Sequence, residues 1–150
     1  MKAIVVTDPA AGTAGMTLAE RPEPLAAIND VVVQVHAAGW VSTELEWPST
    51  WVDRAHRDRT PSIPGHEVAG VVTALGYGTT GLSVGQRVFG LADWHRDGTL
   101  AEYVAMESRN LAPLPDDLDF TGMFHGVDER VPVDSLKFGA RVLNTLLTNY

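Results

Sequence analysis

The chain has 150 residues, of which 45% are hydrophobic and 20% are charged, a composition typical of one soluble globular domain. Its formal net charge of −8 argues against a nucleic-acid partner, and no apolar run reaches the length of a membrane span. The absence of cysteine excludes disulfides and thiolate ligands for a metal.

The first 39 residues indicate a hairpin followed by a long strand. Residues 2–7 are rich in β-forming side chains, but their apolar run is too short for a signal-peptide core, so we expect a cytoplasmic protein. Residues 8–15 predict a loop, and residues 16–21 predict the return strand. Residues 30–39 alternate with period two, which places Val31, Val33 and Val35 on one face. His36 falls on the opposite, mixed face, and we interpret it as structural.

The next segment, residues 41–59, follows neither a strand nor a long-helix pattern. It predicts a loop with a helical turn. Trp40, Trp47 and Trp51 lie in or beside this segment, close together in the chain. Tryptophans in a loop can line an apolar pocket, or they can close the bottom of a small barrel. The sequence leaves both interpretations open.

A turn and two ionisable side chains precede the following strand, residues 68–75. Pro64 fixes its own φ, and Gly65 permits a backbone angle that other residues resist. His66 and Glu67 come next, and such a pair at the mouth of a strand suits proton transfer or metal chemistry. The same pair is also compatible with a structural histidine beside a surface glutamate.

Short strands and glycine-rich turns continue to residue 120, with strands predicted near residues 86–90, 99–106 and 110–114. The fold class is therefore mainly β, a small barrel or sandwich. Residues 133–150 carry apolar side chains at helical spacing, which predicts one C-terminal amphipathic α-helix.

Residues 1–120 resemble the N-terminal GroES-like domain of the medium-chain dehydrogenases/reductases, the family of zinc alcohol dehydrogenases and quinone oxidoreductases. The resemblance rests on motifs in the family's order: Val33-Gln34-Val35-His36-Ala37-Ala38-Gly39, Ile63-Pro64-Gly65-His66-Glu67-Val68-Ala69-Gly70, Val84-Gly85-Gln86-Arg87-Val88-Phe89-Gly90 and Gly98-Thr99-Leu100-Ala101-Glu102-Tyr103-Val104. It implies a GroES-like β-barrel.

The resemblance also implies a set of site residues. His66 and Glu67 match the family's zinc-binding histidine and the glutamate beside it, and Thr43 matches the hydroxyl residue of the proton relay. Glu44 stands where an aspartate is usual, but Val41 occupies the place of the first cysteine ligand. We therefore expect His66, Glu67 and Thr43 to mark the catalytic cleft without a tightly bound zinc.

The family continues from this point into a Rossmann domain that binds NAD(P). Our sequence contains no Gly-x-Gly-x-x-Gly between a strand and a helix and has no room for such a domain. We expect no tightly bound cofactor, and NAD(P) only where another chain supplies a Rossmann domain.

The tail departs from the family altogether. Residues 122–150, with the run Phe124-His125-Gly126-Val127-Asp128-Glu129, resemble the C-terminus of zinc aminoacylase/carboxypeptidase-like peptidases, in which His125 would match one metal ligand. The remaining ligands of that family are missing. We expect two regions, a GroES-like domain over residues 1–120 and a loop with its helix over residues 121–150, packed on the domain or on a second subunit.

Three functions follow as hypotheses. The chain is the substrate-binding half of an alcohol dehydrogenase or quinone oxidoreductase, with Trp40, Trp47 and Trp51 bordering a cleft for a small apolar or aromatic molecule. Alternatively, it is a cofactor-independent binding protein or a non-redox enzyme, such as an isomerase or cyclase, that uses the same cleft. The third hypothesis is a non-catalytic module that forms homo-oligomers through the C-terminal helix.

Overall fold

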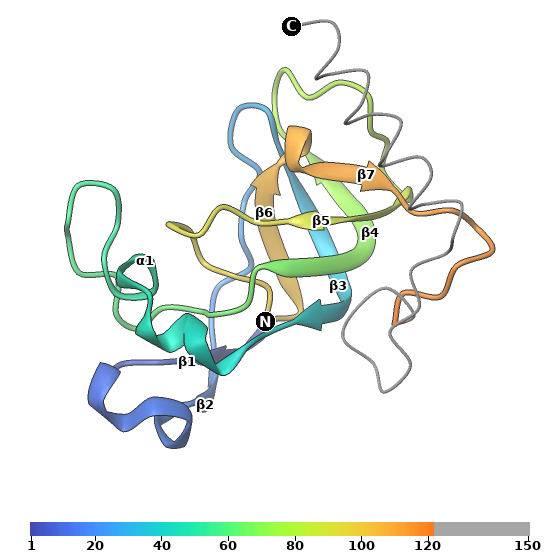
Figure 1. Cartoon of the computed structure of the whole chain (residues 1–150). Coiled ribbons are helices and arrows are strands. Elements are labelled where there is room, and N and C mark those ends of the chain that lie inside the picture. Colours follow the sequence, from blue (N-terminus) through green and yellow to red (C-terminus); the bar gives the residue numbers. More distant parts are fainter. Residues whose placement is uncertain (122–150) are drawn as a thin grey trace, which may run out of the picture.

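Antiparallel pairing of seven strands organises the part of the chain that the structure, a computed structural model, describes, which is residues 1–121 (Figure 1). A five-stranded sheet has the order β6-β3-β4-β5-β7, and β1 pairs with β2 in a separate two-stranded sheet. The strands are β1 Lys2–Val5, β2 Thr17–Glu20, β3 Asp30–Gly39, β4 Glu67–Leu75, β5 Arg87–Leu91, β6 Tyr103–Glu107 and β7 Leu111–Pro113. The predicted mainly β fold class is confirmed.

The helical segments of residues 1–121 are all short. The 3₁₀ segments cover Pro9–Gly15, Ser42–Glu46 and Ser108–Asn110, and the helix α1 covers Pro48–Trp51. None of the helices in residues 1–121 has the length and apolar content needed to cross a membrane. The predicted amphipathic helix, the tail region and His125 lie outside the described residues.

The longest strand, β3, pairs with β4 on one side and with β6 on the other. Its predicted alternation holds in part: Val31 and Val33 are fully buried while Gln34 and His36 are exposed, but Val32 on the second face is buried as well. His36 stacks on Phe120, with ring centroids 4.5 Å apart. The hairpin of β1 and β2 is also confirmed, with Lys2 opposite Glu20 and Val5 opposite Thr17.

The strand predicted for residues 99–106 begins later than expected, at Tyr103. Its first residues are used elsewhere: Thr99 N–H donates to the Gly65 carbonyl at 2.8 Å, and Leu100 N–H donates to the Pro64 carbonyl at 3.1 Å. Ala101 forms an isolated bridge with Ala3. Residues 99–101 therefore connect the turn before β4 and the β1–β2 hairpin to the main sheet. Regular pairing with β3 begins only at Tyr103.

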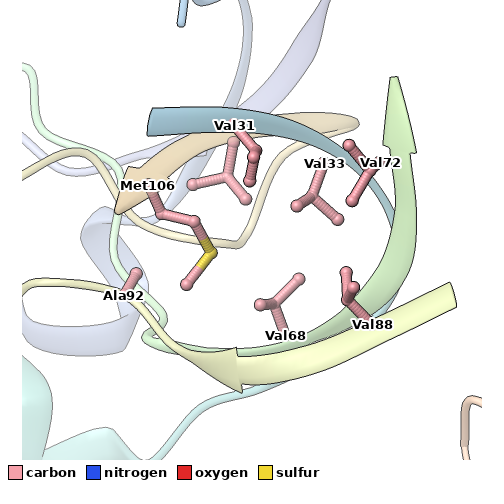
Figure 2. Packing of buried hydrophobic residues seen from close by; sticks show 8 residues of the cluster. Val31, Val33, Val68, Val72, Val88, Ala92 and Met106 are labelled. Carbon is pink, nitrogen blue, oxygen red and sulfur yellow. The ribbon is translucent and has the colours of Figure 1, made fainter. Parts of the chain in front are cut away.

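One apolar cluster fills the space enclosed by the curved five-stranded sheet (Figure 2). Its buried members are Val31, Val33, Val68, Val72, Val88, Ala92, Val104 and Met106. Met106 reaches from β6 across the cluster towards β4 and β5 (Figure 2). Valine dominates because a β-branched side chain packs well on a pleated surface, and Met106 fills the irregular centre.

Met106→Ala should lower the free energy of unfolding by about 3 kcal/mol, because it removes a fully buried side chain and leaves a cavity among the valines. Urea unfolding followed by far-ultraviolet circular dichroism measures the change. Val84→Ala is the matched control, because Val84 is 62% exposed, and its effect should stay below about 0.5 kcal/mol. Equal effects for the two variants would contradict the assignment of the core.

Candidate functional site

His66 stands between the Pro64-Gly65 turn and the first residue of β4. Gly65 has a φ of 89°, in the left-handed region that favours glycine. A Cβ at this position would also lie 2.8 Å from Thr99 Oγ1 and 2.9 Å from Leu100 Cγ. The glycine thus lets the turn press against residues 99–100. The result is a histidine directed inward, with only 5% of its surface exposed.

The partner of His66 is Glu44, from the 3₁₀ segment Ser42–Glu46. Glu44 Oε2 lies 2.8 Å from His66 Nδ1 and accepts the Gly65 N–H at 2.9 Å, while Oε1 accepts the Val41 N–H at 3.3 Å. Glu44 itself is 4% exposed. A carboxylate can only accept hydrogen bonds, so Nδ1 carries the hydrogen and Nε2 is the ring nitrogen left for a ligand.

Two tryptophan rings lie beside this buried pair. The ring centroid of Trp47 is 5.7 Å from that of His66, and the Trp94 centroid is 6.3 Å away in an edge-on orientation. The two tryptophans are tilted against each other at 5.1 Å. Trp94 is 51% exposed, so the cluster reaches solvent on its side. An imidazole next to such an aromatic surface can hold an apolar or aromatic molecule and exchange a proton with it.

The structure brings together only some of the predicted site residues. His66 and Trp47 are in contact, but Thr43 is exposed, and Trp51 donates its Nε1–H to the Leu45 carbonyl at 2.8 Å within its own loop. Trp40 is half-buried, and its Nε1 finds no acceptor within residues 1–121. Trp47 is the predicted tryptophan whose ring lies against that of His66.

Glu67 follows His66 in the sequence, but its carboxylate is not the one that pairs with the imidazole. It is opposite Gly39 in the β3–β4 ladder, and its carboxylate lies so close to Gly39 that a Cβ there would be 1.8 Å from Oε2. Successive residues of an extended chain point to opposite sides. In the structure, the carboxylate hydrogen-bonded to His66 is therefore that of Glu44, and a catalytic role for Glu67 stays a prediction.

Sequence reasoning missed two members of this site. Glu44 follows Thr43 in a short turn, and a single step along that turn decides which side chain points inward. Trp94 lies in a polar loop after β5, and no periodicity marks it. For Glu44, the available signal was that the resembling family usually has an acidic residue at this position. For Trp94, it was a large apolar side chain among charged ones.

Charged side chains fasten the tryptophan-containing loop to the loop that carries Trp94. Arg54 forms an ion pair with Asp93, and Arg59 donates to the Trp94 carbonyl at 3.3 Å. Asp53 accepts hydrogen bonds from the Arg57 main chain and side chain, and these bonds lower the pKa of Asp53 to about 2. The two loops that supply Trp47 and Trp94 are thereby held in one arrangement.

A metal ion does not fit the side chains present here. Within residues 1–121 no three histidine, aspartate or glutamate side chains converge to hold a metal, and position 41 is a half-exposed valine. One histidine and one carboxylate are too few ligands for a catalytic zinc site. The same part of the chain contains no strand–helix–strand unit of the kind that binds a dinucleotide.

Comparison with known proteins identifies the family to which this domain belongs. The model of the alcohol dehydrogenase GroES-like domain matches residues 27–116. The chain belongs to this family. Its match includes β3, the tryptophan-containing loop, the Pro64-Gly65-His66 turn and β4 to β7.

Several proteins similar to this chain are dehydrogenases or oxidoreductases by name. The chain is 43% identical over 91 residues to an L-threonine 3-dehydrogenase of Saccharopolyspora erythraea. This match covers 60% of the chain and 25% of that dehydrogenase. An alcohol dehydrogenase superfamily protein from Novosphingobium aromaticivorans has a TM-score of 0.66 at 30% identity, covering 80% and 36% of the two chains. A quinone oxidoreductase from Coxiella burnetii has a TM-score of 0.66 at 25% identity, covering 80% and 38%.

The chain spans only about a quarter to two-fifths of the curated relatives that it matches. The likeness to this GroES-like family therefore concerns one domain of longer proteins.

The pairing of Glu44 with His66 predicts one tautomer of the ring. In long-range ¹H–¹⁵N spectra of the neutral imidazole, His66 should show a protonated Nδ1 and an unprotonated Nε2, because the carboxylate accepts from Nδ1. Glu44→Ala should shift the ring towards the Nε2–H tautomer, whereas Glu46→Ala, at an exposed position of the same turn, should leave it unchanged. A wild-type ring protonated only at Nε2 would contradict the geometry.

Asp53 should titrate with a midpoint of about 2, far below an ordinary aspartate. Because the pKa is lowered in the folded state, this carboxylate stabilises the fold fully above pH 4, and the stabilisation is lost as the pH falls towards 2. Carbon-13 NMR of the side-chain carboxyl measures the midpoint. Arg57→Gln should raise it partway, since the bond from the main-chain N–H of residue 57 persists. An unchanged midpoint in this variant would contradict the role of the guanidinium.

Proposed function

We propose that this chain forms the substrate-binding part of an alcohol dehydrogenase or quinone oxidoreductase, and that it transfers no hydride alone. Family membership supports the oxidoreductase class, and partial coverage of the relatives supports the role of one part of an enzyme. The observation that carries the proposal is a buried, oriented histidine beside two tryptophan rings at the surface of the domain.

The site's own residues would position a substrate and move its proton. A carbonyl or alcohol oxygen would approach His66 Nε2, and Trp47 and Trp94 would hold the apolar part of the molecule and keep water from it. Glu44 would stabilise the imidazolium that forms when Nε2 takes a proton. Thr43, which is exposed, would contact the substrate at the entrance of the site. Glu67, the next residue after His66, would support the histidine from behind. NAD(P), held by a separate nucleotide-binding domain, would supply the hydride chemistry.

A second candidate function is a cofactor-independent binding protein or non-redox enzyme. The observation that favours it is that the pair of Glu44 and His66 and its aromatic surface are complete within residues 1–121. An isomerase needs only such a base beside a bound carbonyl compound. The third hypothesis, an oligomeric module joined through the C-terminal helix, depends on residues outside the described part of the chain.

Binding of benzaldehyde, a small aromatic carbonyl compound, tests the site. The four tryptophan indole N–H signals in ¹H–¹⁵N spectra report on it separately, and those of Trp47 and Trp94 should shift in a saturable way. The Trp51 signal is an internal control, because its N–H is bonded to the Leu45 carbonyl inside the loop. Trp94→Ala should weaken binding several-fold, by about 1 kcal/mol. Equal shifts of all four signals would contradict the proposed cleft.

Addition of NADPH separates the two candidate functions. The proposal of a partial oxidoreductase predicts no saturable binding of NADPH by the chain alone, measured by calorimetry at concentrations up to about 1 mM. Micromolar affinity would contradict it. Exchange of the α-hydrogens of cyclohexanone for deuterium without cofactor, lost in His66→Ala but retained in His36→Ala, would favour the isomerase-like alternative.

A further inference from the structure

A second pocket, with a volume of about 520 Å³, opens between the segment after β2, the loop around Asp97 and the start of β6. It is distinct from the aromatic site described above, because Glu44, His66, Trp47 and Trp94 do not line it. Three basic side chains line the pocket: Arg21, Arg59 and Arg96. Its apolar lining comes from Pro24, Leu25 and Tyr103.

Arg59 is the deepest of the basic groups. Its side chain is only 10% exposed, and its Nη1 donates to the Ser49 and Trp94 carbonyls. Nη2 is buried and has no hydrogen-bond acceptor within residues 1–121, since the nearest carboxylate oxygen, of Asp97, is 3.7 Å away. Burial lowers the pKa of Arg59, and the charges of Asp97 and its neighbours oppose this effect only in part. The pocket thus contains a buried cation with a spare donor.

Arg21 faces the same carboxylate from the other side. Its Nη2 lies 3.7 Å from Asp97 Oδ2, again beyond hydrogen-bond distance. Asp97 itself accepts the Ile63 N–H at 3.2 Å, which keeps it in place between the two guanidiniums. Arg96, in contrast, is paired with Asp30 at 2.6 Å, and this bond raises its pKa. The donors available to a ligand are therefore those of Arg21 and Arg59.

We propose that this pocket binds a small organic carboxylate. The carboxylate group would accept hydrogen bonds from Arg59 Nη2 and Arg21, and the hydrocarbon part would lie against Leu25 and Tyr103. Leu25 is 88% exposed, which suits a side chain that an apolar ligand covers. The negative charges of Asp97 and Glu23 at the same pocket favour a monoanion over a phosphate dianion. Because the whole chain carries a charge of −8, an anion has little attraction to its surface in general.

Titration with hexanoate, followed by the backbone amide signals of Gly98 and Tyr103, tests the proposal. Wild-type protein should show saturable shifts at millimolar ligand. Arg21→Gln should weaken binding about tenfold, because one charge-assisted hydrogen bond is lost. Asp97→Asn should strengthen it several-fold, since it removes a competing charge while its side-chain oxygen still accepts the Ile63 N–H. These opposite responses cannot both come from loss of folding.

Arg109→Gln is the matched control. Arg109 is exposed and lies away from this pocket, yet its loss changes the net charge as Arg21→Gln does. Affinity should stay unchanged in this variant. Equal weakening by the two arginine variants would overturn the proposal, as would equal binding of neutral 1-hexanol or tighter binding of inorganic phosphate. The absence of saturation by hexanoate up to about 10 mM would overturn it as well.

Discussion

One carboxylate, that of Glu44, joins the segments on which the site depends. It accepts hydrogen bonds from the Gly65 N–H, from His66 Nδ1 and from the Val41 N–H. Without it, the first two donors would be buried and unsatisfied, at a cost of about 1–3 kcal/mol each. The tryptophan-containing loop and the entrance to β4 therefore form a single unit, although 22 residues separate Glu44 from His66.

The core fixes this unit in space. β4 begins one residue after His66 and contributes Val68 and Val72 to the buried cluster. On the neighbouring strand, the Gln34 carbonyl comes so close to Gly70 that a Cβ there would lie 2.1 Å from it. Such tight contact between β3 and β4 leaves the start of β4 little freedom to shift. The position of the imidazole is thus set by the packing of valines several residues away.

The strands could be predicted because their signals are local. Period-two alternation in β3 and the left-handed glycine before His66 each depend on neighbouring residues alone. The site could be predicted only in part, because its partners are distant in the sequence. Adjacency suggested Glu67 as the partner of His66, whereas the fold brings Glu44 to it. The local signal of Trp94, a large apolar side chain among charged ones, did not reveal its neighbours, since only the path of the β5–β6 connection places it beside Trp47.

The same connection also links the arginine pocket to the aromatic site beside His66. Its Trp94 side chain contacts His66 and Trp47, while Asp97, three residues later, lies between Arg21 and Arg59. Arg59 touches both sides, because Nη1 donates to the Trp94 carbonyl and Nη2 faces Asp97. A guanidinium is planar and rigid, so a ligand that draws Nη2 towards itself must also turn Nη1. The carbonyl that Nη1 holds belongs to Trp94, whose ring lies beside that of His66. Arg59 therefore connects the arginine pocket to the aromatic surface beside His66 through one side chain and one main-chain hydrogen bond.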